Sequence, residues 1–250
     1  MKGKSLFKRW IVNISLIIGI VGLSIYFSTG SGIKVFNSAL ANNKEIPVHS
    51  VDRNDRVVAL TINTGFSDQY TGEILDLLNK KGVRATFFTM GSWIDMYRNE
   101  AVAIHENGHE IGNNSLTYPH ISQISRENLE MEILETDKKI KAVTGKVSNV
   151  FRPPYGEYSD KSQRVVNDLE KVSVVWSVDS RECITNKELF LKKVSSGSII
   201  LFNNNSKESL EALKYTIESL QSQGYKFETL SDMLYKESYY IDHTGRQKGI

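Results

Sequence analysis

Short apolar runs alternate with amphipathic helical patterns along most of this 250-residue chain, and this alternation limits the possible folds more than any other feature. Residues 57–62, 85–89 and 198–202 have the β-branched and aromatic content of buried strands. Residues 126–143 and 206–223 instead place apolar side chains at helical spacing. Strands that alternate with helices favour a parallel sheet covered by helices, either open or closed into a barrel. The sequence therefore predicts an α/β fold.

Several weaker patterns extend this scheme. Helices are expected at residues 72–80 and 96–106, and the β-branched content of residues 171–178 predicts one further buried strand. Thr185 and Glu188 form a capping-box pattern, which predicts the start of another helix. No internal repeat is evident, so these elements are expected to form one domain.

The amino-terminal part differs from the rest in composition. Basic residues precede an apolar run of about 18 residues, which at 1.5 Å per residue reaches roughly 27 Å and just spans a bilayer core. Basic flanks stay on the cytoplasmic side, which places the remaining chain on the extracytoplasmic side. In chain order we expect a cytoplasmic basic tail at 1–9, a transmembrane anchor at 10–27, a linker at 28–54, the folded domain at 55–237 and a flexible tail at 238–250.

A cleaved signal peptide is the alternative to an anchor. Ala39-Leu40-Ala41 offers an A-x-A-like cleavage site, although it lies well beyond the end of the apolar run. We therefore favour a single-pass membrane protein over a secreted one, and both alternatives export the domain. Four of the 31 basic residues flank the apolar run, so the exported part carries a net charge of about −2 and offers no basic face for nucleic acid. Cys183 is the only cysteine, which excludes an internal disulfide.

Polar residues stand at or just after the ends of the predicted strands. Functional side chains of parallel sheets gather at the carboxyl ends of their strands, because these ends meet at one edge. The sequence therefore predicts a site at that edge. Its candidate residues are Asn63, Thr64, Asn114, Arg152, Asp179 and Asn203.

Three motifs in this region resemble those of a known family. Residues 151–156 read FRPPYG, residues 108–113 read GHEIGN, and residues 61–66 read TINTGF. In this order and spacing they resemble the NodB-type polysaccharide deacetylases, carbohydrate esterase family four. The resemblance covers residues 57–234. It implies a distorted (β/α) barrel of the NodB type and an N-acetylated glycan, such as peptidoglycan, as the substrate class.

The resemblance also implies a metal site, and the residues here depart from it. Members of the family bind a divalent metal such as zinc through one aspartate and two histidines. The corresponding positions are Thr64, Asn114 and Tyr118. These side chains offer only neutral oxygens and amides, which are poor ligands for zinc. We therefore expect no bound metal cofactor.

The acid–base positions are altered as well. The resemblance places the catalytic base at Asn63 and the catalytic acid at Asn203, and neither carboxamide can take up or release a proton near neutral pH. Arg152, which orients the base in the family, and Asp179, the partner of the acid, are retained. We expect Arg152 to bond the Asn63 oxygen and Asp179 to accept a hydrogen bond from Asn203. These four residues are thus the vestige of a catalytic centre.

The altered motifs favour a catalytically inactive member that binds N-acetylated cell-wall glycan or a wall-associated protein. Tyr155 and Tyr118 are the candidate substrate-binding residues, since aromatic rings stack on sugars. The alternative is an active N-deacetylase with a rearranged site, in which Asp68 and His120 provide an unconventional metal site. His105 and His109 also match the H-E-x-x-H zincin pattern, but Gly108 interrupts the helix that this pattern requires.

Overall fold

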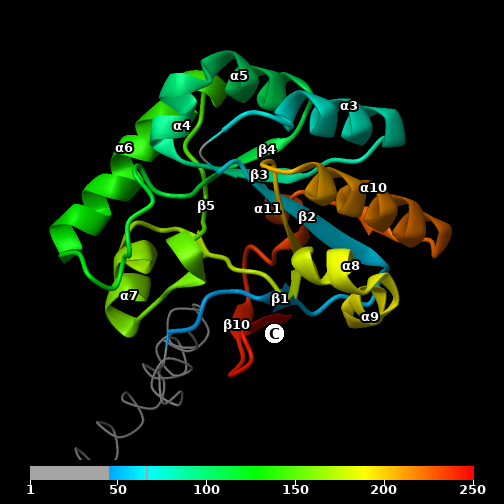
Figure 1. The fold of residues 1–250 in the computed structure, drawn as a ribbon. Coiled ribbons are helices and arrows are strands. Elements are labelled where there is room, and N and C mark those ends of the chain that lie inside the picture. The colour runs from blue at the N-terminus through cyan, green and yellow to red at the C-terminus, as the bar shows by residue number, and fades with distance from the viewer. Residues whose placement is uncertain (1–44, 66) are drawn as a thin grey trace, which may run out of the picture. The chain divides into compact units, whose positions relative to one another are not determined.

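The computed structural model describes residues 45–65 and 67–250, and its centre is a curled parallel sheet (Figure 1). The described strands of this sheet run in the order β6-β5-β4-β3-β2-β8-β7, and β9 pairs beside β2. All of these pairs are parallel. The strands are β2 (Val57–Asn63), β3 (Thr86–Thr89), β4 (Glu110–Asn113), β5 (Val150–Phe151), β6 (Val172–Ser173), β7 (Val178–Asp179), β8 (Ile199–Asn203) and β9 (Lys226–Phe227).

Helices cover the outer face of the sheet (Figure 1). They are α3 (Thr71–Lys81), α4 (Gly91–Met96), α5 (Arg98–Glu106), α6 (Arg126–Thr144), α7 (Asp160–Asp168), α8 (Arg181–Thr185), α9 (Lys187–Lys193) and α10 (Lys207–Ser222). The short helix α11 (Leu230–Met233) packs instead with Val57, Ala59 and Phe88 in a separate apolar cluster. The helices predicted at 72–80, 126–143 and 206–223 are confirmed to within two residues. The segment 96–106 forms most of α5, while its first residue ends the separate helix α4.

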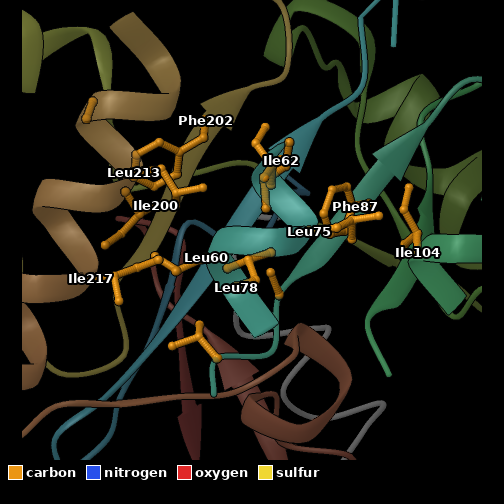
Figure 2. Packing of buried hydrophobic residues seen from close by; sticks show 14 of the residues in the cluster. Leu60, Ile62, Leu75, Leu78, Phe87, Ile104, Ile200, Phe202, Leu213 and Ile217 are labelled. Atoms are coloured by element: carbon orange, nitrogen blue, oxygen red, sulfur yellow. The ribbon is translucent and has the colours of Figure 1, made fainter. Parts of the chain in front are cut away.

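Alternation along β2 separates the hydrophobic core from the site. Leu60 and Ile62 point outward and pack with Leu78, Leu213 and other apolar side chains of α3 and α10 (Figure 2). Full burial of each such side chain stabilises the fold by about 1.5–3 kcal/mol. Thr61 and Asn63, which alternate with them, face the concave side. The strand is therefore anchored by one set of residues and supplies polar groups to the site with the other.

The sheet is open, and a segment before β2 lies across the gap between its edges. Val48 forms a parallel bridge with Val174 near one edge, and Ser50 forms an antiparallel bridge with Ser198 beside β8. The linker predicted for residues 28–54 is therefore wrong in its last part, because residues from Glu45 onward belong to the folded unit. Backbone pairing with Val174 and Ser198, together with the full burial of Val48 and Val51, orders this segment.

The carboxyl-terminal residues 238–250 are also structured, which corrects the predicted flexible tail. Strands β10 (Tyr239–Ile241) and β11 (Arg246–Gly249) form an antiparallel hairpin, and β11 pairs in parallel with β1 (Ser50–Val51). Gln247 is fully buried, and its side-chain amide both accepts from and donates to the backbone of Tyr235. The sequence of this segment has only a weak apolar pattern. Backbone hydrogen bonds and the side-chain amide of Gln247 order it instead.

Two further predictions of local structure are wrong. Residues 171–178 form two short strands rather than one, because β6 and β7 lie on opposite edges of the sheet and the chain crosses between them. The helix expected to start at Thr185 starts after Asn186, whose side-chain oxygen accepts a hydrogen bond from the backbone of Leu189 at 3.0 Å. Asparagine caps a helix as well as threonine does.

Within residues 45–65 and 67–250, no helix is long and apolar enough to cross a membrane. The predicted basic tail at 1–9 and anchor at 10–27 lie outside the described residues, so they remain predictions.

The buried amide of Gln247 gives a test of the carboxyl-terminal sheet. We expect Gln247→Ala to lower the free energy of unfolding by about 1–3 kcal/mol, because it removes a fully buried side chain and leaves two partly buried backbone groups of Tyr235 without these partners. Gln123→Ala, at an exposed turn, is the matched control and should change stability by less than about 0.5 kcal/mol. Chemical denaturation measures both. Equal stabilities of the two variants would contradict an integral role for this sheet.

Candidate functional site

The carboxyl ends of the parallel strands bring the predicted site residues to one edge of the sheet. Asn63 ends β2, Asp179 ends β7 and Asn203 ends β8. Asn114 follows β4, and Arg152 follows β5. The clustering predicted from the sequence is therefore confirmed at the level of the backbone, because neighbouring parallel strands end on the same side.

Arg152 is the centre of the hydrogen bonding in this cluster. Its guanidinium is fully buried and donates from Nη1 to Oδ1 of Asn63 at 3.0 Å, as predicted. Nη2 donates to Oγ1 of Thr61 at 2.9 Å and to the carbonyl of Val175 at 3.1 Å. The guanidinium also lies over the ring of Phe88, 4.0 Å from its centroid. Three strands are thus joined on the concave side by one side chain.

Every acceptor of Arg152 is neutral, so its charge has no ionic partner in the described part of the chain. Burial disfavours the charged form and lowers the pKa of Arg152 from 12.5 to about 9. A buried cation without a carboxylate is costly, and the guanidinium is held here by amide, hydroxyl and carbonyl oxygens and by aromatic contact. Arg152 is therefore present without the carboxylate that the resemblance leads us to expect beside it.

The three positions that correspond to metal ligands do not provide the aspartate and two histidines that the resemblance implies for a metal such as zinc. Thr64 is fully buried, and its Oγ1 has no hydrogen-bond partner among the described residues. Nδ2 of Asn114 is committed to the carbonyl of Arg152 at 2.8 Å. The hydroxyl of Tyr118 accepts from the backbone N–H of Tyr155 at 3.3 Å, and burial raises the pKa of this phenol. None of these groups supplies a negative charge at neutral pH.

The retained aspartate has a different partner from the one expected. Asp179 accepts from the backbone N–H of Arg181 at 2.9 Å and from its guanidinium Nη2 at 2.6 Å. The predicted hydrogen bond from Asn203 is therefore wrong, because Arg181 is only two residues away and forms a bidentate ion pair. Within the described chain, Asn203 is instead fixed through its backbone, which donates to and accepts from the hydroxyl of Ser209.

The alternative metal residues are not assembled into a site. Within the described ranges, no group of three or more histidine, cysteine, aspartate or glutamate side chains could hold a metal ion. His120 pairs with Glu157, with 2.9 Å between Nδ1 and Oε1. Its ring also stacks on Tyr155 at 4.3 Å between centroids and an interplanar angle of 9°. The rearranged site with Asp68 thus has no geometric support in the described structure.

Aromatic rings form the rim of the cluster. Tyr155 is 51% exposed; its ring stacks with His120 and makes a T-shaped contact with Tyr118, whose centroid is 4.7 Å from its own. Both tyrosines have left-handed backbone conformations, with φ of 58° at Tyr155 and 64° at Tyr118. Such conformations cost about 1–3 kcal/mol and persist only where surrounding contacts impose them. We call His120, Tyr155 and Tyr118 the aromatic rim.

Sequence reasoning missed the residues that support these groups. Glu132 of α6 is nearly buried and accepts from the backbone N–H groups of Leu116 and Thr117, both at 2.8 Å, which fixes the loop that carries Tyr118. Thr61 supports Arg152 from within β2. Thr61 could have been found from its alternation with Asn63. Glu132 could not, because only the packing of α6 against the loop gives it this role.

The H-E-x-x-H pattern lies away from this cluster, at the amino end of β4. His109 is buried, and its Nδ1 accepts the backbone N–H of Ala85 at 3.3 Å. Burial lowers the pKa of His109 from 6.5 to about 4, with a smaller effect from Arg84. His105 and His109 both line a cavity of about 280 Å³ at this end of the sheet. Asn107 caps the end of α5, so the two histidines do not share one helix.

Fold and site define the class: an α/β protein with a curled parallel sheet and a polar cluster at the carboxyl ends of its strands. Residues 50–174 match the family model described as polysaccharide deacetylase. A peptidoglycan-N-acetylglucosamine deacetylase of Bacillus cereus is 32% identical over 196 residues, which cover 74% of this chain and 91% of that protein. The chain belongs to the polysaccharide deacetylase family.

Three further proteins are similar to this chain. The peptidoglycan-N-acetylglucosamine deacetylase PgdA of Listeria monocytogenes is 30% identical over 207 residues; the match covers 81% of this chain but only 44% of that protein. A family-four carbohydrate esterase pseudoenzyme from Bacillus anthracis has a similar structure, with a TM-score of 0.70 and 26% identity over 84% of this chain and 72% of the other. A mutant of that pseudoenzyme with restored enzymatic activity is equally similar, with a TM-score of 0.70.

The uncompensated charge of Arg152 predicts that a carboxylate at position 63 stabilises the fold. We expect Asn63→Asp to raise the free energy of unfolding at pH 7 by about 1–3 kcal/mol, because the new carboxylate pairs with the buried guanidinium. Arg152 would hold the pKa of this Asp below its ordinary value, so the gain should be lost as the pH falls below about 4.

Asn114→Asp is the matched control, with the same change in charge. Its carboxylate would face the carbonyl of Arg152 in place of an N–H donor, so we expect destabilisation. Denaturant unfolding at several pH values measures both variants. Destabilisation of equal size in the two variants would show that Arg152 does not require an anion.

The lowered pKa of His109 predicts a loss of stability in acid. Because the folded-state value lies below the ordinary 6.5, the neutral ring stabilises the fold fully above pH 6.5, and this contribution falls as the pH approaches 4. Relative to a His109→Gln variant, the wild type should lose about 1–3 kcal/mol between pH 7 and pH 4. His243→Gln, at an exposed turn, should follow the wild type. Parallel curves for all three proteins would contradict a buried neutral His109.

Proposed function

We propose that this protein is a catalytically silent polysaccharide deacetylase homologue that binds N-acetylated cell-wall glycan on the extracytoplasmic side of the membrane. The observation that carries this proposal is the hydrogen bond between Arg152 and the neutral oxygen of Asn63, at 3.0 Å. The arginine keeps the position expected for orienting a base, and the group that it orients cannot act as one. The geometry of the site is thus maintained without its acid–base chemistry.

At other positions of the cluster, too, neutral side chains stand where the family has ionisable ones. Hydrolysis of an amide in this family requires a base, an acid and a metal that activates water. Asn63 and Asn203 cannot transfer protons, and Thr64 and Asn114 offer no anionic or imidazole ligand. Asn114 is nevertheless nearly buried and bonded, as are Asn63 and Arg152. The hydrogen bonds of Asn114 and Asn63 with Arg152 favour a maintained site over one that drifted without function.

Glycan binding is supported by the aromatic rim and by the relatives. Tyr155 presents an exposed ring that is held in place by His120 and Tyr118, and aromatic faces pack well on the apolar faces of sugar rings. The B. cereus relative and the Bacillus subtilis relative PdaA are named as deacetylases of peptidoglycan N-acetylglucosamine and N-acetylmuramic acid. We infer that this chain retains recognition of a related wall glycan; a wall-associated protein is the other partner we consider.

Membrane attachment is part of the proposal and rests on the sequence of residues 1–27. Four basic residues precede an apolar run that is long enough to span a bilayer, so the positive flank would stay inside and the domain outside. The relatives' peptidoglycan substrates lie on that side. Secretion after cleavage would place the domain in the same compartment.

Glycan and metal binding by the full-length protein in detergent test this proposal. We expect no stoichiometric zinc after dialysis, no release of acetate from N-acetylglucosamine oligomers, and measurable calorimetric binding of those oligomers. Tyr155→Ala should weaken binding by about 10-fold, since loss of one stacking ring costs on the order of 1.4 kcal/mol.

Tyr158→Ala is the matched control for the rim. Its ring is similarly exposed but packs edge-on against His49 instead of within the rim, so binding should change by less than about 2-fold. Zinc retained through dialysis together with acetate release would overturn the silent site and favour a rearranged hydrolase. Absence of both metal and glycan binding would leave a role through a protein partner.

A further inference from the structure

We propose that Asn63 and Asn203 together recognise the acetamido group of the bound sugar and discriminate against the corresponding free amine. This inference rests on the proposed glycan binding and goes further, because it assigns a specificity to two residues that replace a base and an acid. It follows from the orientation of the Asn63 amide, the position of the Asn203 amide and the positive charge of Arg152.

Arg152 fixes the orientation of the Asn63 amide. A guanidinium can only donate hydrogen bonds, so the oxygen of Asn63 must face Nη1 of Arg152, as it does at 3.0 Å. The Nδ2 group then points away from Arg152, and within the described residues it makes no hydrogen bond. It is also absent from the fully buried unpaired atoms of the described chain. Asn63 therefore offers N–H donors to a ligand and keeps its acceptor for Arg152.

The second amide lies beside the first. Asn203 is the register partner of Asn63 in the parallel pair of β2 and β8. Neighbouring strands lie about 4.8 Å apart, and register partners extend their side chains to the same face. Asn203 is partly exposed, and its side-chain amide makes no hydrogen bond with the part of the chain that the structure describes. It can therefore present its oxygen or its nitrogen as a ligand requires.

These two amides complement an acetamido group. The acetyl oxygen accepts from Nδ2 of Asn63, and the amide N–H of the sugar donates to Oδ1 of Asn203, so each polar atom of the ligand gains a partner. A deacetylated sugar has no acetyl oxygen, and its binding would leave the donors of Asn63 unpaired.

The positive charge of Arg152 also favours the acetylated sugar over the free amine. An ammonium group bound at Asn63 and Asn203 would approach the buried guanidinium of Arg152, which has no carboxylate partner in the described chain. Asp179, the retained aspartate of the cluster, is already paired with Arg181 at 2.6 Å. No net negative charge is thus offered to the amine at this edge of the described structure, and like charges repel across the low-dielectric interior.

Calorimetric titration of the full-length protein in detergent at pH 6 tests this inference, with an N-acetylglucosamine tetramer and a glucosamine tetramer as the two probes. We expect the acetylated tetramer to bind at least 10-fold more tightly. Asn63→Asp should reduce this preference to less than about 3-fold, because the new carboxylate accepts from the ammonium and removes the donor. Asn203→Ala should reduce it as well, without adding a charge.

Asn128→Asp, at an exposed position of α6, is the control for the added charge and should keep the wild-type preference. Thermal unfolding of each variant verifies that it is folded. Equal binding of the two tetramers by the wild type would overturn the inference while leaving glycan binding intact, as would an unchanged preference in both Asn63→Asp and Asn203→Ala. Failure of the wild type to bind either tetramer would overturn the proposed function and this inference together.

Discussion

The buried guanidinium of Arg152 is the interaction on which the rest of the site depends. It joins Thr61 and Asn63 of β2 to the carbonyl of Val175 and packs against Phe88 of β3. A buried cation must be surrounded by hydrogen-bond acceptors, so each of these neighbours is constrained in identity and orientation. The neutral acceptors hold the guanidinium without a carboxylate, and burial lowers the pKa of Arg152.

Recognition of a ligand and acid–base chemistry require different properties of a side chain. Proton transfer requires groups whose charge changes near neutral pH, whereas recognition of an amide requires only correctly oriented donors and acceptors. Asparagine preserves the second property and removes the first. A pseudoenzyme of the same family and its mutant with restored activity both have structures similar to this one.

Much of the fold could be predicted because the spacing of apolar residues along the sequence indicates which face of a helix or strand is buried. The long helices α6 and α10 and the central strands β2, β3 and β8 follow from it to within two residues. The segments that were misjudged have little apolar content: residues 45–54 and 238–250 are ordered by backbone pairing and by the buried amide of Gln247. Such pairing depends on which strands meet, and local sequence does not specify it.

At the site, the sequence alone determined which residues stand at the strand ends and which acid–base groups are absent, because these properties belong to single positions. The hydrogen bond between Arg152 and Asn63 also followed from the motif. The tertiary structure decided the partners: Asp179 pairs with Arg181, His120 stacks on Tyr155, and Glu132 holds the loop of Tyr118. Side chains far apart in sequence compete for the same partner, and only their distances in the folded chain decide which contact forms.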